Sequence, residues 1–169
     1  TDNTTGSNNV ALGTQALGNN TTASDNTALG TYSLRDTETG HSNVAVGRSA
    51  LTVNTASQNT ALGREALTLN TSGARNVAVG CNALDANTTA SDNTGVGMNS
   101  LTANTTGGSV TALGAAALAS NTDGDNNTAL GKAALYNNVS AHNNTAVGKD
   151  ALFANTTGYS NTAVGKDAL

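Results

Sequence analysis

The sequence predicts an all-β protein, a parallel β-solenoid (β-roll) of ten 17-residue coils, and three observations support this fold class. A glycine preceded by Leu or Val recurs at steps of 17 residues, with one step of 16, and a leucine follows each such glycine four residues later. This unit is too short for two-helix or leucine-rich repeats, which need at least about 20 residues. Gly and Asn-Thr clusters interrupt every unit, which disfavours helices. The glycines are Gly13, Gly30, Gly47, Gly63, Gly80, Gly97, Gly114, Gly131, Gly148 and Gly165.

The first expected strand of each coil is the segment that ends at this glycine, as in "NTALG" at 59–63. The repeat template is N-[TV]-A-[LV]-G-x-x-[AS]-L-x-x-N-T-x-x-x-x. Thr and Val exchange at its second position, and both are β-branched residues that favour strands. The glycine itself has two candidate roles, a positive φ at a corner or close approach of a neighbouring chain segment.

The second expected strand of each coil is "xALxxN", as at 65–70. Coils that stack about 4.8 Å apart place identical repeat positions in columns, so ten coils make a rod of roughly 48 Å. We expect the leucine column and the Leu/Val column before glycine to form a dry interior, with Ala where two walls approach. The structural ladder of leucines comprises Leu17, Leu34, Leu51, Leu67, Leu84, Leu101, Leu118, Leu135, Leu152 and Leu169.

Two asparagine columns accompany these strands. One lies four residues before the glycine, with Val110 as its exception, and the other lies seven residues after it, with Thr37 as its exception. Stacked Asn side chains form amide ladders in cross-β structures, and we expect the same here. For the second column, turn capping by Asn is an alternative. The single deleted residue lies between Asn54 and Asn59, which predicts an outward loop there.

The domain organisation is a single repeat array over residues 1–169, which we expect to be a segment of a longer fibre because neither terminal copy differs from the rest. A hydrophobic content of 37% in a regular pattern excludes a disordered chain. No apolar run approaches the roughly 18 residues of a membrane span. The net charge of −4 provides no basic cluster for nucleic acid.

The sequence offers no residues that point to catalysis, so we expect a protein that is not an enzyme, with no catalytic, cofactor-binding or metal-binding residues and no cofactor. His41 and His142 lie in variable loops of distant repeats, and Cys81 stands at a rim position after a glycine. The acidic stretch at 121–127 occurs once, whereas calcium-binding repeats need regular acidic spacing.

Glycosylation is a further hypothesis, because the acceptor pattern N-x-[ST] occurs repeatedly. Five asparagines with this pattern in the column seven residues after the glycine are the candidate glycan acceptors: Asn20, Asn70, Asn87, Asn104 and Asn155. The alternative is that the pattern follows from a template rich in Asn and Thr. Glycans on this column predict a glycan-covered fibre.

The repeat also resembles a known family. The segments "NVAVGRSAL" (43–51), "NTALGREAL" (59–67) and "NTAVGKDAL" (161–169) are similar to the N-[SV]-x-A-[IV]-G-x-x-S repeats in the head domains of YadA-type trimeric autotransporter adhesins. Similar "NTALG" arrays occur in phage tail-fibre proteins. The leucine in every copy and the longer period depart from the adhesin unit. The resemblance covers the whole chain and implies a left-handed parallel β-roll, three chains side by side, and an extracellular rod that binds surfaces.

These observations predict a structural component of an extracellular fibre or adhesin, located outside the cell, at a cell surface or on a virion. The expected partners are copies of the chain, as a homotrimer or a head-to-tail filament, and a cell-surface or glycan ligand. The alternative function is a single-chain ligand-binding solenoid such as an ice-binding protein, although the column Val10, Thr27, Val44 mixes Val with Thr. A catalytic solenoid would need acids clustered at one site, which the sequence lacks.

Overall fold

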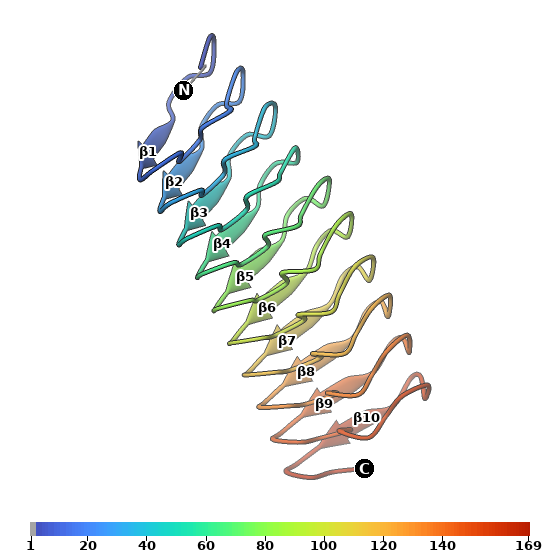
Figure 1. Ribbon diagram of the computed structural model, residues 1–169. Coiled ribbons are helices and arrows are strands. Elements are labelled where there is room, and N and C mark those ends of the chain that lie inside the picture. The colour runs from blue at the N-terminus through green and yellow to red at the C-terminus, as the bar shows by residue number, and fades with distance from the viewer. Residues whose placement is uncertain (1–2) are drawn as a thin grey trace.

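The computed structural model describes residues 3–169 and shows an all-β chain whose coils stack into one parallel β-solenoid (Figure 1). Each repeat contributes one strand of three residues, and each strand pairs in parallel with the next one along the chain. The first and last strands, β1 and β10, lie at opposite ends of the stack. The strands are β1 (Val10–Leu12), β2 (Thr27–Leu29), β3 (Val44–Val46), β4 (Thr60–Leu62), β5 (Val77–Val79), β6 (Thr94–Val96), β7 (Thr111–Leu113), β8 (Thr128–Leu130), β9 (Thr145–Val147) and β10 (Thr162–Val164).

The pairing register matches each repeat position with the same position in the next coil. Ala28 pairs with Ala45, and Val44 pairs with Thr60 across the shortened repeat. The missing residue is absorbed between Asn54 and Asn59, outside any strand, which confirms the loop predicted there. The sheet therefore runs without a register shift through β10.

The prediction of a second strand in each coil is wrong. Residues 65–70 form turns, and φ is +58° at Glu65 and +50° at Leu67. These left-handed residues interrupt an extended backbone. The N–H groups nevertheless bond to adjacent coils, since Glu65 donates to the Arg48 carbonyl at 2.9 Å and Leu67 donates to the Ala83 carbonyl at 3.0 Å. Hydrogen bonds between coils thus continue on this side of the solenoid without a strand.

The interior contains the leucine column and an alanine column. Leucines from Leu34 to Leu135 in this column are fully buried, and so is Ala61 in the middle of β4. The prediction that the Leu/Val column before glycine lies inside is wrong, because Leu62 is 46% exposed and Leu12 is 71% exposed. Side chains alternate along a strand, so an inward Ala directs both of its neighbours outward.

The recurrent glycine has both of the roles considered for it. At Gly80, φ is +135°, a value that side chains other than glycine rarely adopt. A Cβ atom placed there would also lie 2.6 Å from the carbonyl carbon and oxygen of Gly97 in the next coil. Close stacking at the corner therefore requires glycine for two separate reasons.

The asparagine column after the glycine forms the expected amide ladder. Asn87 Nδ2 donates to Asn70 Oδ1 at 2.7 Å and also to the carbonyl of Ala90 at 3.0 Å. The column before the glycine differs from the expectation, because Oδ1 of its asparagines up to Asn144 accepts a backbone N–H rather than a side-chain amide. Asn59 Oδ1, for example, accepts the N–H of Asn76 at 2.9 Å.

Both asparagine columns meet at a third column, the carbonyls of the Gly or Ala residues seven positions before each glycine. The Ala90 carbonyl accepts Nδ2 of Asn87 and, at 2.9 Å, Nδ2 of Asn76 from the preceding coil. Neutral amides are buried at little cost when their hydrogen bonds are made. The polar side of the interior is therefore a network of neutral amides and carbonyls that needs no charge.

Thr37 is the one break in the ladder after the glycine, and it leaves two buried atoms without partners. Asn20 Oδ1 and Thr37 Oγ1 are buried and make no hydrogen bond. In Thr37→Asn, the new Nδ2 reaches Asn20 Oδ1 and the Gly40 carbonyl, and the new Oδ1 accepts Nδ2 of Asn54. We expect this variant to raise the free energy of unfolding by about 2 kcal/mol, measured by urea titration.

The control is Thr89→Asn, which makes the same change at an exposed threonine outside the ladder. It should alter stability by less than about 0.5 kcal/mol. Equal effects of the two substitutions would contradict the role assigned to the ladder.

Candidate interaction surface

The outer face of the sheet presents uncharged side chains along all ten strands. Each strand directs its first and third residues outward, and in all ten strands these residues are only Val, Thr or Leu. Neighbouring strands lie about 4.8 Å apart, which gives the length of the strip over nine spacings, and a strand rises about 3.3 Å per residue, which gives its width over three residues. The area of the strip is therefore roughly 430 Å². The largest apolar patch on a typical monomer covers about 300–600 Å² and is often functional, so this strip of Val, Leu and Thr is a candidate interaction site. Its most exposed members are Val10, Leu12, Val44, Leu62, Leu113, Leu130 and Val164.

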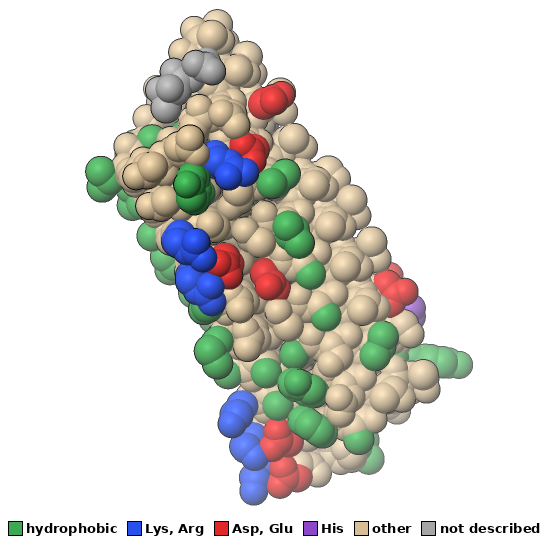
Figure 2. Space-filling view, in the orientation of Figure 1, with side chains coloured by type: hydrophobic (Ala, Val, Ile, Leu, Met, Phe, Trp, Pro, Cys, Tyr) green, Lys and Arg blue, Asp and Glu red, His purple; other side chains and the backbone are tan. Residues whose placement is uncertain are grey.

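A row of charges borders this outer face at the edge where the strands end. Figure 2 shows these cations along one edge of the molecule, with acids beside several of them. Arg48 pairs with Glu65 at 2.5 Å, and Lys149 contacts Asp150. The hydrogen bond to Asp150 raises the pKa of Lys149. These pairs are exposed, so they add little to stability, but they limit the apolar strip on this side.

The middle of the same edge carries no charge in three successive coils. Cys81, Met98 and Ala115 follow the glycines there, and Met98 is 58% exposed. Arg64 in the preceding coil donates to Cys81 Sγ at 3.2 Å, and this contact raises the pKa of Arg64. The apolar face is consequently widest beside β5, β6 and β7.

The leucine ladder belongs to the interior and is not part of this surface. Its members from Leu17 to Leu152 are at most 5% exposed, whereas Leu169 in the final coil is 81% exposed. Their role is to fill the solenoid.

The proposed glycan acceptors lie in the buried amide ladder. Asn70, Asn87 and Asn104 are fully buried, Asn20 is 1% exposed and Asn155 is partly buried. Their Nδ2 atoms, to which a glycan would attach, donate hydrogen bonds inside the solenoid; Asn104 Nδ2, for example, donates to Asn87 Oδ1 at 3.1 Å. The folded structure therefore argues against glycans at these five positions.

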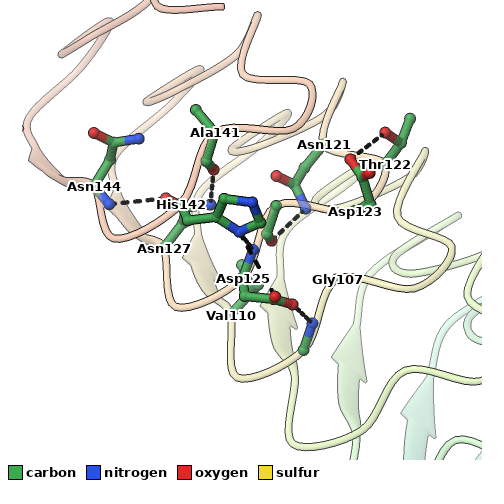
Figure 3. A network of polar contacts seen from close by, with 12 residues as sticks. Gly107, Val110, Asn121, Thr122, Asp123, Asp125, Asn127, Ala141, His142 and Asn144 are labelled. Atoms are coloured by element: carbon green, nitrogen blue, oxygen red, sulfur yellow. Dashed lines mark hydrogen bonds and ion pairs between the residues drawn. The ribbon is translucent and has the colours of Figure 1, made fainter. Parts of the chain in front are cut away.

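The two histidines lie in loops of distant coils, as the sequence indicated, and both stand six residues before a repeat glycine. His41 contacts Ser42 Oγ through Nδ1 at 3.3 Å. His142 belongs to a loop network with Asp125 that Figure 3 shows from close by. Within residues 3–169, no three His, Cys, Asp or Glu side chains come together in a group that could hold a metal ion.

Tyr136 and Phe153 stack at a centroid distance of 5.3 Å in successive coils. Their ring planes differ by 13°, so the faces of the rings are turned along the stack. A hollow beside Phe153 at one end of the solenoid is lined in part by Asp167 and Leu169. The facing sides of the two rings cover each other, and Phe153 is 40% exposed.

Comparisons with models of known protein families, with curated proteins and with solved structures give no match. Among the described residues, no helix has the length and apolar character needed to cross a membrane.

Proposed function

We propose that this chain is a structural component of an extracellular fibre or adhesin, a rigid solenoid rod that associates with copies of itself through the outer sheet face. The single observation that carries the proposal is the row of uncharged Val, Thr and Leu side chains along all ten strands. Water contact with such a strip is unfavourable by about 25 cal/mol per Å² of apolar area, which favours covering it.

A second copy is the partner that suits this face. The strip is straight and repeats with the spacing of the coils, so a parallel copy presents the same periodic surface along its whole length. The strip of roughly 430 Å² is smaller than the about 800 Å² that each partner buries in a standard interface. In a closed trimer, the strip of each chain would lie against two neighbours, which is the arrangement that the resemblance to trimeric adhesins implies.

The same proposal includes the left-handed coil and the homotrimer implied by the resemblance to YadA-type adhesins. The loops between coils are exposed and vary in sequence from coil to coil, in contrast to the strands and the leucine column. Variable loops on a regular scaffold are suited to recognition. We assign attachment to a cell-surface or glycan ligand to these loops.

The test compares Leu113→Asp with Leu69→Asp by light scattering at two protein concentrations. Leu113 lies on the outer sheet face at 39% exposure, and Leu69 lies off that face at 53% exposure. We expect the unmodified chain to have the mass of three chains, Leu113→Asp to have the mass of one, and Leu69→Asp to remain trimeric.

Circular dichroism establishes that both variants retain the β-solenoid, so a lower mass is not due to unfolding. Assembly through this face is contradicted if the unmodified chain has the mass of one chain at both concentrations. It is also contradicted if the trimer persists in Leu113→Asp. A mass that grows with concentration supports a head-to-tail filament in place of a trimer.

A second candidate function is binding to an ordered lattice such as ice. The observation that favours it is the uninterrupted row of outward threonines that opens each strand from β6 to β10. Their hydroxyl groups recur at the coil spacing of about 4.8 Å. Thermal hysteresis of the unmodified chain tests this function, and its absence at high concentration would exclude it.

A further inference from the structure

The loops stack through a side-chain column that lies six residues before each glycine. Serines at this position accept a backbone N–H from the preceding coil. Ser24 Oγ accepts the N–H of Ser7 at 3.0 Å, and Ser91 Oγ accepts the N–H of Ala74 at 3.0 Å. A hydroxyl group can accept this bond at any pH between about 5 and 8, so these contacts do not respond to protons.

His142 takes the place of serine in this column. Its Nδ1 accepts the N–H of Asp125 at 2.9 Å (Figure 3). Only the neutral imidazole with its lone pair on Nδ1 can accept this bond, because both ring nitrogens of the imidazolium are donors. The side chain is about half exposed, so protons from solvent reach it.

The carboxylate of Asp125 is an alternative partner for the same ring nitrogen. Asp125 Oδ2 lies 3.6 Å from His142 Nδ1, while Oδ1 accepts the N–H of Gly108 at 2.7 Å. Asp123 lies in the same loop as Asp125 and bonds to Thr122 Oγ1 at 3.0 Å. Tyr159 occupies this column in the following coil.

We propose that His142 is a proton-operated switch between the loops that precede β8 and β9. When the imidazole takes up a proton at Nδ1, it stops accepting the Asp125 N–H and donates to the Asp125 carboxylate. The Asp125 amide then has no acceptor, and the contact between these two loops loosens. Backbone bonds on both sides remain, since Asn143 donates to the Asp125 carbonyl at 3.1 Å and Ser160 donates to the His142 carbonyl at 3.1 Å.

This inference is independent of the proposed self-assembly, because it concerns loops rather than the outer sheet face. It assigns a pH response to one loop pair, whereas the serine-mediated contacts in this column, such as that of Ser91 Oγ with the Ala74 N–H, do not depend on an ionisable acceptor. Mildly acidic conditions would change the loop surface without disturbing the stack of strands.

The experiment records amide spectra of the full chain with nitrogen-15 introduced only at aspartate, from about pH 8 to about pH 5. The Asp125 signal is identified by its loss in Asp125→Glu. We expect its chemical shift to change between the two ends of this pH range. At the acidic end, its hydrogen exchange should be about fivefold faster than in His142→Ser at the same pH.

His142→Ser restores the acceptor found in other coils and removes the titrating group. Asp25 and Asp92 are controls in the same spectra, because their amides donate to the backbone carbonyls of Ser7 and Ala74. An Asp125 amide that does not respond to pH, or one that responds equally in His142→Ser, overturns the switch. Equal acceleration of Asp25 and Asp92 would indicate general unfolding and also overturn it.

Discussion

Gly80→Ala is expected to lower the free energy of unfolding by about 4 kcal/mol, the largest effect of any single substitution considered for this chain. Two costs combine. A side chain at φ of +135° is strained, and the new Cβ would lie 2.6 Å from backbone atoms of Gly97, which cannot rotate away as a side-chain end could. Separating the two coils at this corner would lengthen their hydrogen bonds, such as that from Gly97 N to the Val79 carbonyl at 2.7 Å.

Gly165→Ala separates these two costs. Gly165 has a φ of +131°, yet the nearest atom to its added Cβ is that of Ala168 at 3.8 Å. This variant therefore has the conformational cost without the clash, and we expect a loss of about 1 to 3 kcal/mol. Urea titration and thermal melting of both variants provide the comparison. If Gly165→Ala were as destabilising as Gly80→Ala, the close approach of coils would not explain the glycine column.

Leu84→Ile is expected to cost about 3 kcal/mol, although the side-chain volume is unchanged. Leu84 is fully buried and has a φ of +52°, and a residue branched at Cβ is a steric outlier in that region. This restriction gives a physical reason why the column contains Leu in every repeat and neither Val nor Ile, which are equally apolar.

The matched control is Leu84→Met, which is unbranched at Cβ and similar in volume. It should cost less than about 1.5 kcal/mol. The free energies of unfolding of both variants are compared with that of the unmodified chain. Equal losses for Ile and Met would show that packing alone, and not the left-handed backbone, selects leucine.

The stacking of coils follows from the sequence because the period is nearly constant. The spacing between Gly63 and Gly80 is repeated along the chain. Residues at the same repeat position therefore stack in columns across the coils, and this does not depend on the local backbone conformation. The prediction of a second strand is wrong because the repeat period gives the spacing of residues along the chain but contains no information on the backbone angle φ. The left-handed conformation of Leu67 follows from the turn, and leucine itself gives no sign of it.

The interaction surface was the harder feature to predict. From hydrophobicity alone, Leu62 is expected inside the solenoid and Ala61 at a contact between two walls. In the structure Ala61 is buried and Leu62 is exposed, because the narrow interior accommodates the smaller side chain. One signal in the sequence does indicate this arrangement. The position of Ala61 is small in every repeat, being Ala or Gly, as expected for a residue between two closely packed layers.

The carbonyl column that joins the two asparagine ladders was also missed. The sequence does contain a sign of this column, because the position seven residues before each glycine is always Gly or Ala, as at Gly73 and Ala90. Such small residues in a loop are easily attributed to turn chemistry. Their carbonyl acceptors become evident only when the neighbouring coils are in place.

The continuity of hydrogen bonds around each coil has a mechanical consequence. Strand, corner, turn and asparagine side chains all bond across the boundary between coils, as Thr60 N does to the Asn76 carbonyl and Asn87 Nδ2 does to Asn70 Oδ1. A pulling force along the axis acts on all of these bonds at once, so none can open ahead of the others. The rod should therefore resist axial tension up to a high threshold and then separate abruptly between two coils.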